Sequence, residues 1–175
     1  MSLLQLRNAS IILGHPPLLN GIELNIHPGE RLCLVGRNGS GKSTLLADIS
    51  GVLMPSFHSE GDLLLNSQDL RQKPVEQRRV ALLFQDDLLF PHLNVFENLL
   101  FALPKGLSKT ERRQKIYTAL ADAELADYGD RDITTLSGGQ RARISLLRTL
   151  LSEPELILLD EPFSKLDRDL RKQFR

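Results

Sequence analysis

The stretch Gly36-Arg37-Asn38-Gly39-Ser40-Gly41-Lys42-Ser43-Thr44 decides the fold. It follows the apolar run Arg31–Val35, which predicts a buried strand, and it precedes Leu45–Ser50, which predicts a helix that Gly51 can end. A glycine-rich loop between a strand and a helix is the setting that a phosphate-binding loop requires. The pattern therefore favours an α/β fold built around this loop.

Each residue type in the loop has a chemical reason. Glycines let successive backbone N–H groups point inward, and the N-terminus of the following helix adds positive potential where phosphate oxygens would lie. Lys42 is expected to reach the β- and γ-phosphates of a nucleotide, and the Ser43 hydroxyl to coordinate Mg²⁺. A glycine-rich turn that binds nothing is the competing interpretation, and the loop alone does not say which kind of phosphate-binding protein contains it.

Length, composition and charge limit the remaining possibilities. The 175 residues fit one domain that is long enough to bury a core. With 41% hydrophobic and 25% charged residues, the composition is that of an ordinary globular protein. Lys plus Arg and Asp plus Glu each total 22, so the net charge of zero provides no field that favours nucleic acid, and no nucleic-acid partner is expected.

The sequence also bears on membrane insertion and on cysteine chemistry. No apolar run reaches the roughly 18 to 20 residues that cross a bilayer, and the N-terminus lacks the pattern of a signal peptide. A membrane role would therefore need a partner. The single cysteine, Cys33, lies in the run Arg31–Val35, where a buried strand residue is favoured over a reactive thiol or a metal ligand, and reducing intracellular conditions suit it.

Further strands and one turn surround the loop. The apolar runs that predict these strands are Leu3–Arg7, Gly21–Ile26, Asp62–Leu65, Val80–Gln85 and Leu156–Asp160. The last run is uninterrupted, which is typical of a strand buried in a parallel sheet. The sequence His27-Pro28-Gly29-Glu30 predicts a type II turn, because proline presets its first central position and glycine tolerates the positive φ of the second.

The middle of the chain changes to helical periodicity. Asn94 with Glu97, and Ser108 with Glu111, each place a capping residue three positions before a glutamate, which is the start signal of a helix. Behind the second signal, apolar residues recur at helical spacing at Ile116, Leu120 and Ala123. This helical block is predicted to be an insertion in the α/β core.

A third helix start lies at Leu136-Ser137-Gly138-Gly139-Gln140. Ser137 and Gln140 form a capping box for a helix that runs through Leu151. Each glycine in the first turn destabilises the helix by about 1 kcal/mol relative to alanine. The presence of two glycines there therefore indicates that function requires a backbone without side chains. A helix N-terminus without obstructing side chains is a second anion site, able to meet a γ-phosphate closely.

Two adjacent carboxylates, Asp160 and Glu161, follow the predicted strand Leu156–Asp160. Neighbours in a strand point to opposite faces, so the two acids must have different roles. Asp160 is placed to hold Mg²⁺ through its waters, and Glu161 to polarise the attacking water as general base. An acidic turn before Pro162 is the competing interpretation of this pair on its own.

With these motifs in order, the chain resembles the ATP-binding cassette (ABC) ATPase family, whose signature sequence is this same Leu136–Gln140 motif. The resemblance covers the whole chain and implies that Gln85 senses and ligates the metal and that Ser164-Lys165-Leu166-Asp167 is a dimer-contact loop. It also implies the family's fold, an α/β P-loop NTPase core with a mainly parallel sheet and flanking helices, an antiparallel β subdomain and an inserted α-helical subdomain. One nucleotide-binding domain, 1–175, is expected, with the core and β subdomain at 1–86 and 152–175 and the helical subdomain at about 87–151.

The resemblance further implies ATP and Mg²⁺ as ligands and a head-to-tail homodimer, or a paired cassette subunit, in the ATP-bound state. Each ATP would be held by the phosphate loop of one copy and the signature of the other. A motor subunit for separate transmembrane permease subunits, cytoplasmic and peripheral on the inner membrane, is the leading interpretation. A soluble regulatory protein that uses the cassette dimer as a nucleotide switch is the alternative.

The segment 86–103 bears on the permease. Its apolar residues exceed what one small helix needs to bury: they are Leu88, Leu89, Phe90, Leu93, Phe96 and Leu99. An exposed patch here would suit docking of a permease helix, whereas packing within the helical block is the alternative. Complete burial of residues 88–93 would remove the docking interpretation.

The sequence departs from the family at two places. Leu13 stands where the family stacks an aromatic residue on adenine, so base discrimination is expected to be weaker. The family's switch histidine follows the catalytic glutamate, but His15, His27, His58 and His92 all precede Glu161. The chain is therefore expected to be a fragment or truncated product with strongly reduced turnover and retained nucleotide binding.

Overall fold

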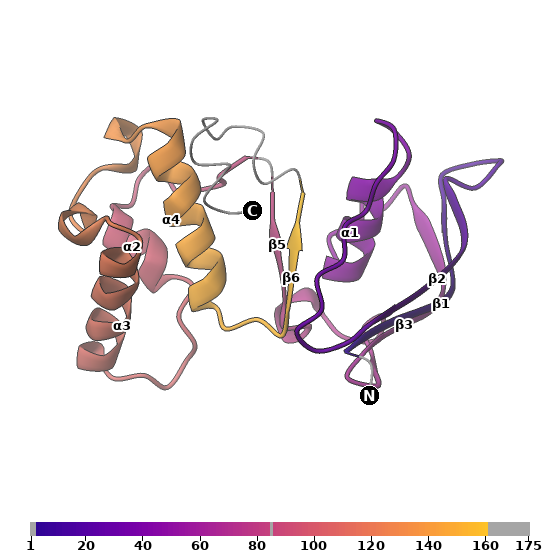
Figure 1. Ribbon diagram of the computed structural model, residues 1–175, viewed down its shortest axis with the longest axis horizontal. Helices are drawn as coiled ribbons and strands as arrows, with labels where there is room; N and C mark the ends of the chain where they lie inside the picture. Colours follow the sequence, from indigo (N-terminus) through magenta and orange to yellow (C-terminus); the bar gives the residue numbers. More distant parts are fainter. Residues whose placement is uncertain (1–2, 85, 161–175) are drawn as a thin grey trace. The chain divides into compact units, whose positions relative to one another are not determined.

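The computed structural model describes residues 3–84 and 86–160, which divide into two compact units, Met1–Val80 and Ala81–Arg175. Figure 1 shows the ribbon of the chain coloured along the sequence. In the described residues, no helix is both long enough and apolar enough to span a bilayer.

The first unit contains an antiparallel sheet. Its strands are β1 (Leu4–Ile12), β2 (Leu19–Ile26), β3 (His58–Leu65) and β4 (Gln68–Asp69), in the order β2-β1-β3-β4. The central strand β1 pairs with β2 and β3, and a bulge at Asn8, whose φ is 48°, interrupts both registers. Buried Leu4, Leu6 and Leu63 form part of the core. Strands were predicted in three of these places, and all three are confirmed.

Helix α1 (Lys42–Ser50) follows the glycine-rich loop and contributes Leu45, Leu46 and Ile49 to the buried residues of this unit. The predicted stop is confirmed, because Gly51 adopts φ 89° and its N–H donates to the carbonyl of Ala47 at 2.9 Å. A residue in the left-handed region ends a helix most easily when it is glycine.

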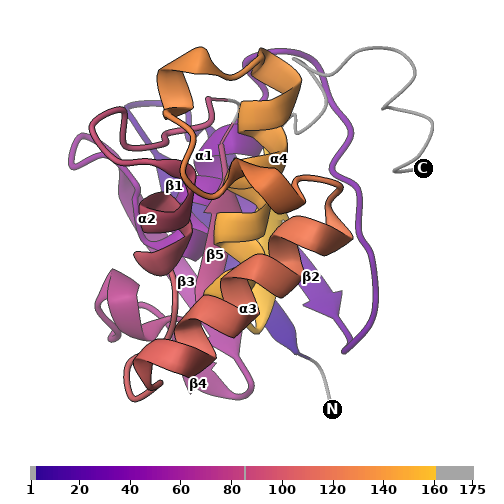
Figure 2. The same cartoon turned by 90° about the vertical axis from the view of Figure 1, so that its left-hand side faces the viewer.

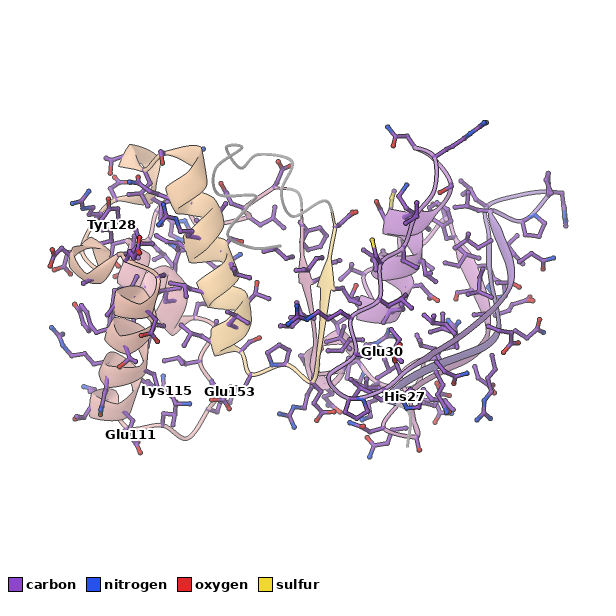
Figure 3. The ribbon with its side chains drawn as sticks, in the orientation of Figure 1. His27, Glu30, Glu111, Lys115, Tyr128 and Glu153 are labelled. Carbon is purple, nitrogen blue, oxygen red and sulfur yellow. The ribbon has the colours of Figure 1, made fainter. Side chains whose placement is uncertain are left out.

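The predicted turn before the loop is also confirmed. The N–H of Glu30 donates to the His27 carbonyl at 3.0 Å, and Gly29 has φ 78°. The Glu30 carboxylate in turn accepts from the N–H of His27 at 2.8 Å, so both ends of the turn are closed (Figure 3).

In the described part of the second unit, the α-helices are α2 (Val95–Leu100), α3 (Lys109–Asp122) and α4 (Gly138–Leu151). Figure 2 looks onto this helical block, whose helices pack against one another. All three predicted capping boxes are confirmed, with Asn94, Ser108 and Ser137 as the N-caps. The hydrophobic core of the block consists of the buried residues Leu89, Val95, Leu99, Leu103, Ile116, Leu120, Leu125, Ile133, Leu136 and Ile144.

Two strands, β5 (Val80–Leu83) and β6 (Leu156–Leu159), lie side by side (Figure 1). The N–H of Asp160, just after β6, donates to the carbonyl of Leu83, the last residue of β5, at 3.0 Å. The carboxyl ends of the two strands therefore meet, which makes the pair parallel as the uninterrupted apolar run of β6 predicted.

One predicted strand is absent. Residues 30–37 are irregular, Cys33 is exposed and Val35 is 91% exposed, so the predictions of a strand at Arg31–Val35 and of a buried cysteine are wrong for this structure. An apolar run shows what a segment can bury, but a strand also needs a neighbour to bond with. Within residues 3–84 and 86–160, no described strand pairs with this run.

Candidate nucleotide-binding site

The phosphate loop is shaped by glycines at positive φ. Gly39 has φ 78° and Gly41 φ 88°, and both values favour glycine because a Cβ is disfavoured there. Gly41 also sits tightly, since an added Cβ would lie 3.0 Å from the Leu19 side chain and 3.3 Å from Leu18. The loop therefore turns sharply into α1 against the start of β2.

Lys42 is held by the loop itself. Its ammonium donates to the carbonyl of Gly36 at 3.0 Å and to that of Arg37 at 2.9 Å. The N–H of Ser40 donates to the same Arg37 carbonyl at 3.2 Å and closes the turn. The cation is thus kept beside the N–H groups of the loop, in the place where an anion gains most from both.

The N-terminus of α1 differs from the other helix starts. Helices α2, α3 and α4 each begin with a complete capping box, whereas the N-cap of α1, Gly41, offers no side-chain cap. The first N–H groups of a helix have no partner within the helix. The partial positive charge at this end attracts phosphate oxygens.

Arginines fix the far end of α1. Arg71 forms an ion pair with the buried Asp48 at 3.1 Å, and Arg78 donates to the carbonyls of Asp48 and Ile49 at 2.9 and 3.1 Å. Burial lowers the pKa of Arg78, and the Asp48 carboxylate opposes that shift. A cation at a helix C-terminus is stabilised by the last carbonyls, so α1 is held firmly behind the phosphate loop.

The signature residues form the start of α4. The Ser137 hydroxyl accepts from the N–H of Gln140 at 3.3 Å, and the side-chain Oε1 of Gln140 accepts from the N–H of Ser137 at 2.9 Å. The side-chain amide nitrogen of Gln140 donates to the Tyr128 hydroxyl at 2.9 Å. Apart from its chain neighbours and the backbone of α4, no described atom lies within 4 Å of where a Cβ on Gly138 would be.

Asp160 is half-buried at the end of β6. Leu156 and Leu158 of that strand are buried, whereas Ile157 and Leu159 are exposed, so the prediction of a fully buried strand is wrong for this structure. Successive side chains of a strand point to opposite faces, and among the described residues only one face of β6 is covered. Gln85 and Glu161 lie outside the described residues, as does the predicted dimer-contact loop Ser164-Lys165-Leu166-Asp167.

The predicted site residues belong to different units. The phosphate loop and Leu13 lie in Met1–Val80, and the signature and Asp160 lie in Ala81–Arg175. Leu13 follows β1 and is 57% exposed. Among the described residues, no three His, Cys, Asp or Glu side chains gather in a way that could hold a metal ion.

Polar residues that sequence reasoning missed link the helical block. Asn98 is fully buried. Its side-chain oxygen Oδ1 accepts from the N–H of Phe90 at 2.8 Å, and its side-chain nitrogen Nδ2 donates to the backbone carbonyls of Phe90, Leu93 and Asn94. A polar residue at an otherwise apolar position of α2 was the available signal, because buried amides need partners. These bonds fix the turn at residues 90–94.

A second missed group joins α4 to the segment after Gln85. It comprises Arg141, Ser145 and Arg148, which bond to Asp87 and Leu88. Burial lowers the pKa of Arg148, and the Asp87 carboxylate opposes that shift. Their spacing of four and three residues on one helix face was the signal in the sequence.

The predicted apolar surface of segment 86–103 is partly exposed. Leu89 and Leu99 are buried in the core of the block, whereas Leu88 is 53% and Phe101 72% exposed. The rings of Phe90 and Phe101 meet edge to face with centroids 4.9 Å apart. Residues 88–93 are therefore not completely buried, and the docking interpretation keeps its support.

A glycine-rich loop that opens into an uncapped helix, with a lysine held at its centre, defines the class of P-loop nucleotide-binding proteins. Comparison with known proteins narrows the class. Residues 19–164 match the family described as "ABC transporter". The chain belongs to this ABC transporter family.

Individual relatives agree with the family. The uncharacterized ABC transporter ATP-binding protein YnjD of Escherichia coli K12 is 43% identical over 99% of this chain and 80% of its own length. The spermidine/putrescine import ATP-binding protein PotA of Legionella pneumophila strain Philadelphia 1 is 41% identical, over 97% of this chain and 46% of its own length. The chain thus spans about half of this importer protein.

A solved structure supports the fold. It is described as the dimeric post-hydrolysis state of the ATP-binding cassette MJ0796 bound to ADP and Pi, and it matches with a TM-score of 0.80 and 30% identity over 97% of this chain and 78% of its own. The predicted fold class, an α/β P-loop NTPase core with an antiparallel β subdomain and an inserted helical subdomain, is confirmed.

Proposed function

We propose that this chain is the ATP-binding and ATP-hydrolysing motor subunit of an ABC transporter. The observation that carries the proposal is a pair of helix starts, one at the N-terminus of α1, which no side chain caps, and one at α4, whose capping box uses the N–H of Gln140 and whose first residue is the glycine Gly138. Each offers backbone N–H groups to an anion. A triphosphate held by α1 of one copy and by α4 of another would use both.

Roles within the site follow from the chemistry of each residue. Lys42 exchanges the carbonyls of Gly36 and Arg37 for the β- and γ-phosphate oxygens. The loop residues from Gly36 to Thr44 supply N–H groups, and Leu13 contacts the adenine with an aliphatic rather than an aromatic side chain. Discrimination between bases is therefore weaker by about the 0.5 to 1.5 kcal/mol that ring stacking adds.

The donor set fits Mg²⁺, which prefers oxygen ligands. The Ser43 hydroxyl, the Asp160 carboxylate and the Gln85 carbonyl oxygen would hold the ion, which neutralises phosphate charge when it is bound. Glu161, the residue after Asp160 in the sequence, accepts a proton from the attacking water as general base.

Coupling to a membrane protein completes the proposal. The chain acts as a head-to-tail homodimer, or as one half of a paired dimer, on the cytoplasmic face of the inner membrane and drives a separate permease. The similar cassette MJ0796 is described as a dimer with ADP and Pi, and the PotA relative is named an import ATP-binding protein, which supports this assignment. The exposed side chains of Leu88 and Phe101 offer the permease an apolar contact.

The substitution Glu161→Gln tests the proposal. ATP hydrolysis is expected to fall by about 10²- to 10⁴-fold, which is the usual contribution of a general base. ATP-dependent dimers are expected to persist, because the metal ligands and both anion sites remain. Steady-state phosphate release and size-exclusion chromatography with and without Mg-ATP measure the two effects.

Lys42→Ala serves as the control, since it should abolish nucleotide binding and therefore dimers as well. Turnover of Glu161→Gln at the parental rate would show that Glu161 is not the base. A chain that neither binds Mg-ATP nor dimerises with it would refute the motor assignment.

A further inference from the structure

One face of α4 carries three polar residues that all reach the same short segment. The Arg141 Nε donates to the Asp87 carboxylate at 2.9 Å, and the Ser145 hydroxyl donates to the Asp87 carbonyl at 2.9 Å. Arg148 donates to the carbonyl of Leu88 at 3.0 Å. Because these residues follow one another at spacings of four and three, they form a single stripe along the helix.

Arg141 also makes a second hydrogen bond, which connects this stripe to the residue before the signature turn. Its Nη1 donates to the carbonyl of Leu136 at 2.7 Å. Leu136 directly precedes the N-cap Ser137, so one guanidinium joins Asp87 to the peptide from which the signature turn begins. The planar fork of arginine holds both acceptors at fixed angles.

Asp87 is itself anchored from the other side. Phe90, three residues later, is bonded through both its N–H and its carbonyl to the buried Asn98 of α2. Arg148 also lies over the Phe90 ring, 5.4 Å from its centroid. Residues 87–90 are thus fixed to α2, and through the polar stripe they fix the start of α4.

We propose that Asp87 is a positioning residue that, through Arg141, sets the orientation of the Ser137–Gly139 backbone. This inference rests on the proposed function, in which that backbone meets the γ-phosphate bound by a second copy. Asp87 contacts no reacting atom. Its effect is to hold the open N–H groups of α4 at the angle that closure of the dimer requires.

Hydrogen exchange on the nucleotide-free chain tests the positioning directly. In Asp87→Ala, the amide of Arg141, which donates to the Ser137 carbonyl at 2.9 Å, is expected to exchange about five-fold faster, because the first turn of α4 opens more often. Amides in the middle of α3 should keep the parental rate. Unchanged exchange at Arg141 would overturn the proposal, whether or not the chain dimerises.

The functional consequence is measured as ATP-dependent dimerisation in the Glu161→Gln background. Asp87→Ala and Arg141→Ala are each expected to raise the half-dimerisation concentration about five-fold, and the double variant by no more than either alone, because both remove the same link. Nucleotide binding at the phosphate loop should stay at the parental value.

Asp122→Ala, which removes an exposed acid at the end of α3, is the matched control for charge. Additive effects of Asp87→Ala and Arg141→Ala, or effects that follow only a lowered melting temperature, would overturn the proposal. Absence of dimers in the parental Glu161→Gln chain would instead refute the proposed function, and the exchange result would still decide the role of Asp87.

Discussion

Gly41 and Gly138 both lie at the first turn of a helix, and they differ in what surrounds them. Gly41 has φ 88° and touches Leu19, so the chain's own structure explains its glycine. At Gly138, a Cβ would meet nothing within 4 Å. Local packing therefore gives no reason for glycine at Gly138, whereas the proposed approach of a phosphate to this backbone would give one.

Gly138→Ala is expected to separate stability from function. The free energy of unfolding should stay the same or rise by up to about 1 kcal/mol, because alanine favours a helix. ATP-dependent dimerisation should be lost, because the methyl group occupies the side from which the phosphate would approach. Chemical denaturation and size-exclusion chromatography with ATP measure the two quantities.

Gly41→Ala provides the contrast, since a left-handed residue with a Cβ costs about 1 to 2 kcal/mol and the Leu19 contact is already close. It should lower both stability and nucleotide binding. Normal dimerisation of Gly138→Ala would mean that no partner approaches that backbone.

Among the elements, the stability of α3 is expected to depend on pH through Glu111. Its capping box holds the pKa of Glu111 below the ordinary value of 4.5, chiefly through the hydrogen bond with the Ser108 hydroxyl and then through the Ser108 N–H. A depressed pKa in the folded state adds stability above the unfolded pKa, and this stability is lost as pH falls through the folded pKa.

Ser108→Ala is expected to lower the melting temperature at pH 7 by about 3 to 6 °C, because the helix loses its cap. It should also flatten the decline in stability below about pH 4.5, since the larger cause of the Glu111 shift is removed. Thermal melts followed by circular dichroism between pH 3 and 7 provide the test. Parallel pH profiles for the parent and the variant would contradict this account.

Local chemistry explains which elements the sequence could predict. The capping boxes at Asn94, Ser108 and Ser137 and the glycine stop at Gly51 need only residues within one turn, and all four are present. The strand expected at Arg31–Val35 needs a distant neighbour to bond with, and hydrophobicity alone does not supply one.

In the candidate site too, features formed by neighbouring residues could be predicted and features formed by distant residues could not. The phosphate loop and the signature turn could be located because their glycines and caps are contiguous in the chain. The Asp87–Arg141 pair could not, because its partners are separated by 54 positions and neither residue type is unusual on a surface. Similarly, the bond from Gln140 to Tyr128 depends on how the chain returns between α3 and α4.

For the whole molecule, the proposed function assigns the permease to an apolar patch formed by the exposed Leu88 and Phe101 and by the half-buried Phe90, whose ring meets that of Phe101. Phe101→Ser is expected to reduce recovery of a polytopic membrane protein about ten-fold, because a central aromatic contact contributes strongly to binding. ATP binding should be unaffected. Affinity purification from detergent-solubilised host membranes, followed by mass spectrometry, measures the recovery.

Met54→Ser is the control, since Met54 is comparably exposed but lies in the other unit. Equal recovery with Phe101→Ser and with the parent would exclude this patch as the contact. If the parental chain recovers no membrane protein at all, the nucleotide-switch alternative replaces the motor.

The buried amide of Asn98 has an evolutionary consequence. It satisfies backbone groups of Phe90, Leu93 and Asn94, so the path of this turn does not depend on the exposed side chains of Pro91 and His92. Those side chains are free to diverge among descendants without unfolding the turn that displays them. Lineages can therefore change the tip of this turn while they inherit the scaffold beneath it.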